Sequence, residues 1–113
     1  MTFFEQVCLS CIFLDNIDIP KDSNGNTKSN TSLGQKVHKE YKSDLADGIT
    51  KIKEYTLPSG KRVDYIDFES KTIYELKPNN PTQIAKGQKQ LAGYKAEVEQ
   101  EFGGEWTTVL DTY

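Results

Sequence analysis

A chain of 113 residues, 35% hydrophobic and 27% charged, is long enough for one domain with a modest core. This composition excludes a membrane-embedded protein and a wholly disordered one. The formal net charge is −3, but residues 36–95 hold 12 basic and 8 acidic residues, whereas residues 96–113 hold five acids and no base. The basic middle is compatible with a polyanionic partner, although charge alone favours an ordinary solvated surface.

The apolar N-terminal segment fits two secondary structures. One set of residues has the spacing of an amphipathic helix: Phe4, Val7, Cys8, Cys11 and Ile12. A second set alternates as in a strand: Val7, Leu9, Cys11 and Phe13. We expect the helix. The segment falls short of the ~20 apolar residues that span a bilayer, and no basic residue precedes it as in a signal peptide.

The two cysteines, Cys8 and Cys11, are expected to be buried packing residues. A structural zinc site needs about four ligands, and His38 is the only histidine that could add to the two thiols. No thioredoxin-like pattern surrounds the pair.

Residues 21–32 are almost wholly polar and predict a loop or linker. A helix is predicted over residues 33–47, with Ser32 as its N-cap and Gly48 just after its end. Its apolar stripe has i, i+4 spacing: Leu33, Val37, Tyr41 and Leu45. Glu40 lies at the edge of that stripe.

Three strands are then predicted, over residues 49–56, 62–68 and 72–77, with a turn at LPSGK and a short connection at ESK. Asn80 and Pro81 have the side chains of an N-cap and of a first helical position, so a long helix should begin there and reach about Phe102. Its expected buried face is Gly87, Leu91, Tyr94, Val98 and Phe102. WTTVL predicts a last strand, which makes the order αβββαβ.

The candidate chemistry lies on the second and third of these strands. Glu75 and Lys77 share one strand face because side chains alternate along a strand. Asp64 lies opposite Glu75 if the hairpin loop has an even number of residues, and it points to the other face if the loop has three. We predict the even loop, which places two carboxylates and a lysine on one face.

Two close carboxylates repel unless a cation lies between them, and Mg²⁺ or Mn²⁺ suits carboxylate oxygens and water. Lys77 could then orient or deprotonate a water or meet charge on a phosphate. Glu40 could supply another carboxylate. His38 lies about 200° away from Glu40 around the helix, so it could contact the substrate, and a structural role is equally expected.

These residues resemble the PD-(D/E)XK nuclease superfamily, although Val63 stands where the name of that superfamily has proline. The stretches LGQKVHKEY, RVDYIDF, TIYELKPNNP and GQKQLAGY are similar to restriction endonuclease-like toxin domains of bacterial polymorphic and contact-dependent inhibition toxins. The resemblance implies an α/β (α+β) fold with a mixed central sheet flanked by helices. It covers residues 33–113, which we expect to form the nuclease domain, and residues 1–32 match nothing.

The resemblance also implies roles. Asp64, Glu75 and Glu40 would bind the metal, Lys77 would be catalytic, and Gln90 and Tyr94 (from Q-x3-Y) would contact the substrate. Lys86 could contact phosphates, although a solvated helix face explains it equally well.

The expected activity is therefore metal-dependent hydrolysis of phosphodiester bonds by a metal-activated water, on DNA rather than RNA. A carrier toxin would deliver the domain into the cytoplasm of a target bacterium, and a cognate immunity protein would inhibit it. The alternatives are an RNase or tRNase on the same fold and a binding module without catalysis.

Overall fold

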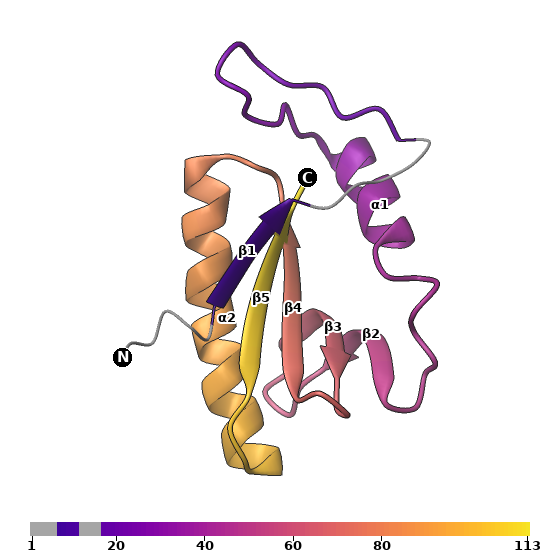
Figure 1. Ribbon diagram of the computed structural model, residues 1–113, viewed down its shortest axis with the longest axis vertical. Coiled ribbons are helices and arrows are strands. Elements are labelled where there is room, and N and C mark those ends of the chain that lie inside the picture. Colours follow the sequence, from indigo (N-terminus) through magenta and orange to yellow (C-terminus); the bar gives the residue numbers. More distant parts are fainter. Residues whose placement is uncertain (1–6, 12–16) are drawn as a thin grey trace.

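The computed structural model describes residues 7–11, as backbone, and residues 17–113 (Figure 1). Its elements in chain order are β1 (Val7–Cys11), α1 (Thr31–Glu40), β2 (Lys51–Thr56), β3 (Arg62–Asp67), β4 (Thr72–Lys77), α2 (Pro81–Phe102) and β5 (Thr107–Thr112). The predicted αβββαβ order is confirmed, with one strand added before it.

The strands form one mixed sheet in the order β1-β5-β4-β3-β2. β5 is parallel to β1 and β4, whereas β3 is antiparallel to β2 and β4. The fold is therefore α+β with a mixed central sheet, as predicted. The long α2 runs along the sheet, and α1 lies at the end where β4 and β5 finish (Figure 1).

The helix predicted for the N-terminal segment is wrong for residues 7–11. These residues form β1, which pairs with β5 from Val7↔Thr108 to Cys11↔Thr112. The free edge of β5 offers a row of backbone hydrogen bonds, and pairing with it outweighs the helical spacing of the apolar side chains. Phe4 and Ile12 lie outside the described residues, as do the side chains of both cysteines.

Helix α1 is shorter than predicted and begins earlier. The Asn30 side chain, rather than Ser32, accepts the N–H of Leu33 at 2.8 Å as the N-cap. At the other end, Lys53 Nζ donates to the carbonyl oxygens of His38 and Lys39, both at 2.9 Å. Lys42 then adopts a left-handed backbone with φ 53°. The helix therefore stops, and Leu45 is 53% exposed instead of joining the apolar stripe.

Each face of the sheet carries its own core. The face under α2 packs Ile66, Ile73 and Leu110 against Leu91, Tyr94 and Val98 of the helix. The opposite face packs Tyr65, Leu76 and Tyr113 against Leu33, Val37 and Tyr41 of α1. Phe102, predicted to be buried, is 44% exposed because it lies at the last turn of α2, beyond most of the sheet.

The polar segment before α1 also contacts the body of the protein. Thr27 is buried, its N–H donates to the Asn79 carbonyl at 3.0 Å, and its hydroxyl donates to the carbonyl of Tyr113. Ile17 and Ile19 pack beside α1. The domain boundary placed at residue 33 stays a prediction.

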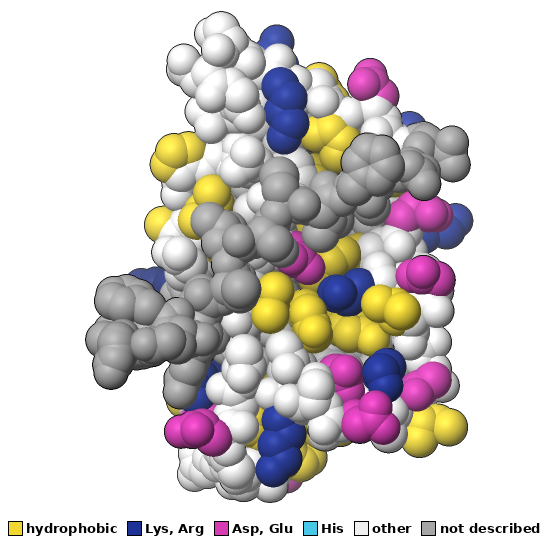
Figure 2. All heavy atoms as spheres, viewed as in Figure 1, with side chains coloured by type: hydrophobic (Ala, Val, Ile, Leu, Met, Phe, Trp, Pro, Cys, Tyr) yellow, Lys and Arg dark blue, Asp and Glu magenta, His cyan; other side chains and the backbone are white. Residues whose placement is uncertain are grey.

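On the face seen in Figure 2, acidic, basic and hydrophobic side chains are intermixed outside the grey atoms. The separation of charge along the sequence therefore does not become a broad surface of one sign there. Among the described residues, neither helix has the length and hydrophobicity that crossing a bilayer requires.

Candidate active site

The β3–β4 hairpin has the predicted register. Its pairs are Tyr65↔Tyr74, Ile66↔Ile73 and Asp67↔Thr72, so the loop has four residues, 68–71. Continuing this register places Asp64 directly opposite Glu75. The ladder stops just before that pair, and Asp64 Oδ2 accepts the N–H of Leu76 at 2.7 Å. The strands therefore part where the two carboxylates meet.

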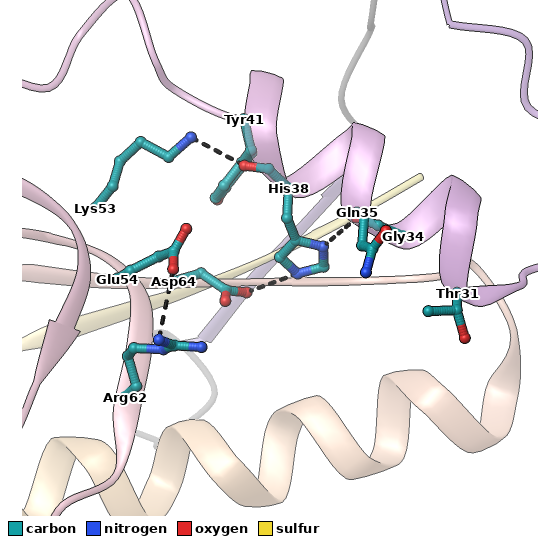
Figure 3. Close-up of a pocket in the computed structure, with 9 residues that line it drawn as sticks. All are labelled: Thr31, Gly34, Gln35, His38, Tyr41, Lys53, Glu54, Arg62 and Asp64. Atoms are coloured by element: carbon teal, nitrogen blue, oxygen red, sulfur yellow. Dashed lines mark hydrogen bonds and ion pairs between the residues drawn. The ribbon is translucent and has the colours of Figure 1, made fainter.

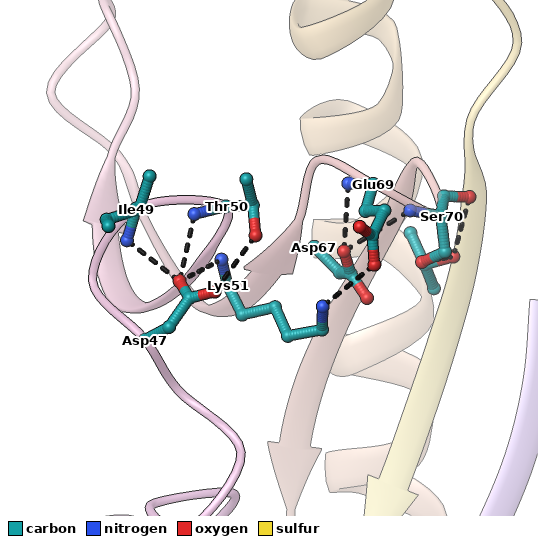
Figure 4. Close-up of polar contacts among 8 residues, drawn as sticks. Asp47, Ile49, Thr50, Lys51, Asp67, Glu69 and Ser70 are labelled. Atoms are coloured by element: carbon teal, nitrogen blue, oxygen red, sulfur yellow. Dashed lines mark hydrogen bonds and ion pairs between the residues drawn. The ribbon is translucent and has the colours of Figure 1, made fainter.

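Asp67 helps to fix this register. It is buried and accepts the N–H groups of Glu69 and Ser70 at 2.9 and 3.2 Å (Figure 4). An aspartate side chain that accepts backbone N–H groups two or three residues later stabilises a turn at that place. The four-residue loop, and with it the alignment of Asp64 with Glu75, thus depends on a side chain on the other sheet face.

Glu75 is the most constrained carboxylate of the site. It is 5% exposed, its Oε2 lies 3.6 Å from Lys77 Nζ, and its Oε1 is buried without a hydrogen-bond partner. Burial, and then the charge of Asp64, raise the pKa of Glu75 to about 7, against the opposing effect of Lys77. The positive charge of Lys77 therefore does not offset the burial of Glu75 and the repulsion between the two carboxylates.

Lys77 is held in place by close packing of β4 against α2. Its side chain is only 15% exposed. Gly87 of α2 lies directly over it: a Cβ built at that glycine would come within 2.9 Å of Lys77 Cγ and 2.7 Å of Leu110 Cδ1. The absence of a side chain at Gly87 is therefore what lets the helix cover the lysine.

Gly87→Ala should destabilise the domain by about 1–3 kcal/mol, because the added methyl group overpacks this contact. It should also slow any reaction that needs Lys77 in its present position. Gly93→Ala is the matched control, since a Cβ there meets nothing within 4 Å and alanine favours helix by about 0.5–1 kcal/mol. Urea unfolding of both variants measures the difference, and equal stabilities would contradict the packing argument.

Gln90 and Tyr94 line the same groove on α2, and Tyr94 lies within electrostatic reach of the carboxylates. Gln90 Oε1 is buried without a hydrogen-bond partner. Tyr94 is 7% exposed, and burial followed by the charges of Glu75 and Asp64 raises its pKa to about 12. Its hydroxyl therefore stays protonated and can donate a hydrogen bond at neutral pH.

Lys86 lies beside these two residues on α2, together with Lys89, which the sequence likewise offers as a possible phosphate contact. A groove of about 530 Å³ is lined by Lys61, Lys86, Lys89, Gln90, Gly93 and Tyr94. Among the described residues, none of the three lysines forms an ion pair with an acidic side chain. The i, i+3 spacing of Lys86 and Lys89 could have indicated a shared helix face, but Lys61 joins them only through the fold.

His38 reaches Asp64 from α1. Its Nε2 lies 3.4 Å from Asp64 Oδ2, and its Nδ1 lies 2.9 Å from the Gly34 carbonyl oxygen (Figure 3). The hydrogen bond with Asp64 is the main reason that the pKa of His38 is raised. His38 therefore holds the carboxylate in place, and its predicted contact with the substrate stays a prediction.

Glu40 is exposed and is not brought to the Asp64–Glu75 pair. Within residues 17–113, no three His, Cys, Asp or Glu side chains gather as ligands for one ion. The structure therefore gives Glu40 no geometric part in a metal site.

The Asp64–Glu75 pair still has the chemistry that Mg²⁺ uses, because this ion commonly takes one or two carboxylates and keeps several waters. Leu76 N–H and His38 Nε2 both contact Oδ2 of the Asp64 carboxylate, and its Oδ1 is the oxygen that would face an ion. Glu75 Oε1 is a buried acceptor without a donor. Two repelling carboxylates with one unused oxygen each fit a divalent cation.

A family model described as restriction endonuclease fold toxin 9 matches residues 26–113. Searches of curated proteins and of solved structures gave no significant match. The family match covers most of the chain and includes the hairpin, both helices and every candidate residue described above. The chain therefore belongs to the restriction endonuclease fold toxin family 9.

Proposed function

We propose that this toxin domain is a metal-dependent nuclease that hydrolyses phosphodiester bonds, with DNA as its preferred substrate. The observation that carries the proposal is the buried Glu75, whose free Oε1 and raised pKa occur opposite Asp64 and 3.6 Å from Lys77. A purely structural carboxylate would be expected to have its hydrogen bonds satisfied.

In the proposed reaction, Asp64 and Glu75 would hold Mg²⁺ or Mn²⁺, which would supply positive charge beside the phosphate and make a water more acidic. Hydrolysis forms a new P–O bond with the oxygen of a water, the bond to one ester oxygen breaks, and the proton that the water loses is balanced by the proton that the departing oxygen takes up from solvent. Lys77 Nζ lies beside Glu75 and positions the attacking water or meets the charge that develops on the phosphate. His38 keeps Asp64 oriented through Oδ2.

The lysine groove beside α2 would hold the substrate backbone. Lys61, Lys86 and Lys89 supply charge for phosphates, and the groove ends at Gln90 and Tyr94, next to the carboxylates. Gln90 Oε1 needs a donor, which a bound water or the amino group of a base could provide. This arrangement supports the predicted substrate contacts of Lys86, Gln90 and Tyr94.

Replacing both Lys86 and Lys89 by alanine should weaken nucleic-acid binding by a similar factor for all sequences. The slope of log affinity against log salt should become shallower by about two, because two phosphate contacts are lost. Fluorescence anisotropy on a Glu75→Gln background measures binding without cleavage. Lys28→Ala, an exposed lysine before α1, is the control and should leave the slope unchanged. An unchanged slope in the double variant would remove the groove from the binding site.

The nuclease activity itself is tested with purified protein, Mg²⁺ or Mn²⁺, and four substrates: plasmid, single-stranded DNA, total RNA and tRNA. We expect cleavage of DNA that EDTA stops and that Lys77→Ala reduces. Cleavage of RNA alone would assign the domain as an RNase, whereas binding without any cleavage would assign it as a binding module.

A nuclease toxin must be kept inactive in the cell that makes it. We propose a cognate immunity protein with an acidic surface that faces the lysine groove, since complementary charge speeds and orients association. We also propose that a carrier toxin delivers the domain into the cytoplasm of a target bacterium.

A further inference from the structure

A second hollow, separate from the lysine groove, includes Asp64 in its lining. It has a volume of about 330 Å³, near the lower end of the range for small-molecule sites, and it lies between α1, β2 and β3. Asp64 and His38 form one wall, while Gln35, Glu54 and Arg62 add polar groups around the opening (Figure 3). This hollow therefore shares the Asp64 carboxylate with the candidate active site.

Glu54 has an unusual backbone at this hollow. Its φ is 52°, a left-handed conformation that residues other than glycine rarely adopt. The β2–β3 ladder pairs Lys53 with Tyr65 and Tyr55 with Val63, so Glu54 lies opposite Asp64 at a break in the pairing. Strained residues of this kind persist where the surrounding structure imposes them, often at binding sites. Here the strained residue, Glu54, lies directly across the ladder from Asp64. Like charges that face each other on neighbouring strands normally destabilise a sheet.

The side chains at the opening offer hydrogen bonds of both kinds. Glu54 accepts, Arg62 donates, and Gln35 can do either. Glu54 and Arg62 lie 3.6 Å apart and are 55% and 63% exposed, so both ends remain accessible to a ligand. Lys53 is not available in the same way, because its Nζ donates to two α1 carbonyls and to Ser43 Oγ. Glu54 and Arg62 contact each other, and with Gln35 they place an acceptor and donors side by side at the opening. This set matches the edge of a nucleobase better than a phosphate, because a phosphate would be repelled by both Glu54 and Asp64.

Resting on the proposed nuclease function, we infer that this hollow holds one unpaired nucleobase beside the scissile phosphate. Glu54 accepts hydrogen bonds from an exocyclic amino group, as carboxylates do with cytosine N4. Arg62 and Gln35 donate to the ring nitrogen or carbonyl oxygen next to it. The ring nitrogen next to the amino group belongs to the Watson–Crick edge, which a paired base does not expose, so this pair of contacts requires a single-stranded or opened cleavage site.

The test is cleavage of a random-sequence single-stranded DNA pool and of the same pool made double-stranded, followed by sequencing of the product ends. With the wild type we expect faster cleavage of the single strands and at least fivefold depletion of thymine at one position next to the cut. Glu54→Gln should reduce that depletion. Glu54→Gly checks the fold, because glycine accepts φ 52° and should melt no lower than the wild type. Glu101→Gln, an exposed acid on α2, should leave the end sequences unchanged.

A second measurement uses binding alone. In EDTA, a Glu75→Gln variant should bind an oligocytidylate of eight deoxynucleotides more tightly than the matching oligothymidylate, and adding Glu54→Gln should remove the difference. Cleavage with unbiased ends, or end sequences that Glu54→Gln does not alter, would overturn the inference and leave the nuclease proposal standing. If no substrate is cleaved, the nuclease proposal fails, and equal binding of the two oligonucleotides would then overturn the inference as well.

Discussion

Glu75→Gln is expected to abolish metal-dependent cleavage and, at pH 8 without metal, to make the folded domain more stable than the wild type. Activity should fall by roughly 10²–10³-fold or more, as when other charge-stabilising groups are removed from reaction centres. Stability should rise by about 1–3 kcal/mol, because an ionised Glu75 is buried near Asp64 and its pKa is raised from 4.5 to about 7. The full difference between those values corresponds to about 3 kcal/mol.

The direction in which stability changes with pH follows from proton binding by Glu75. The folded state binds the proton of Glu75 more tightly than the unfolded state does. The stability that the protonated Glu75 contributes is therefore fully present below about pH 4.5, and this contribution is lost as the pH rises through about 7. The difference in melting temperature between wild type and Glu75→Gln should accordingly grow across this range when both are measured in EDTA. Comparing the two proteins cancels the titrating groups that do not interact with Glu75, whereas His38, whose pKa the charge of Glu75 helps to raise, adds to the difference.

Glu101→Gln removes one exposed carboxylate from α2 and serves as the control for net charge. It should keep both activity and the pH dependence of the wild type. A Glu75→Gln variant that is less stable than the wild type at pH 8 would contradict the strain assigned to this carboxylate. It would mean that the pairing of Glu75 with Lys77 stabilises the ionised form by more than burial and Asp64 destabilise it.

The hairpin and α2 could be predicted from the sequence because their determinants are local. A four-residue loop fixes which residues face one another, and the Asn80–Pro81 pair marks the start of the helix. The apolar periodicity of α2 correctly placed Gly87, Leu91, Tyr94 and Val98 in the core. Strand alternation assigns Glu75 and Lys77 to one face, and Asp64 joins them only because the hairpin loop has an even number of residues.

The parts that could not be predicted depend on distant partners. β1 forms against β5, about 100 residues later in the chain, and no local pattern distinguishes this strand from a helix. Helix α1 ends near Glu40 because Lys53, from the next strand, donates to its last carbonyls. A cap supplied by another element leaves no signal beside the helix itself.

The same distinction applies to the candidate site. The carboxylates and the lysine could be found from their spacing, but the unpartnered oxygens of Glu75 and Gln90 are visible only once packing excludes their donors. The left-handed backbone of Glu54 has no sequence signal, since glycine would be the expected residue there. Glu40 shows the opposite case, in which the resemblance implied a ligand that the shorter α1 leaves exposed.

The second large effect expected is stabilisation by a divalent cation. Mg²⁺ or Mn²⁺ at 100 times its dissociation constant should raise the free energy of unfolding by about 2.7 kcal/mol. The effect should be larger at pH 8 than at pH 5.5, because the raised pKa of Glu75 means that a proton must leave before the carboxylate can bind an ion. Thermal melts with the chloride salts, against EDTA, measure both quantities.

Two variants decide which residues hold the ion. Asp64→Asn keeps an oxygen for the N–H of Leu76 but loses the charge, so it should fold and lose most of the stabilisation. Glu40→Gln should retain it, since Glu40 is exposed and away from the pair. If Glu40→Gln also loses the effect, α1 must move toward the ion on binding and restore the third ligand that the family resemblance implies. If Asp64→Asn melts with the same metal dependence as the wild type, the ion binds elsewhere, and the Asp64–Glu75 pair is not the metal site.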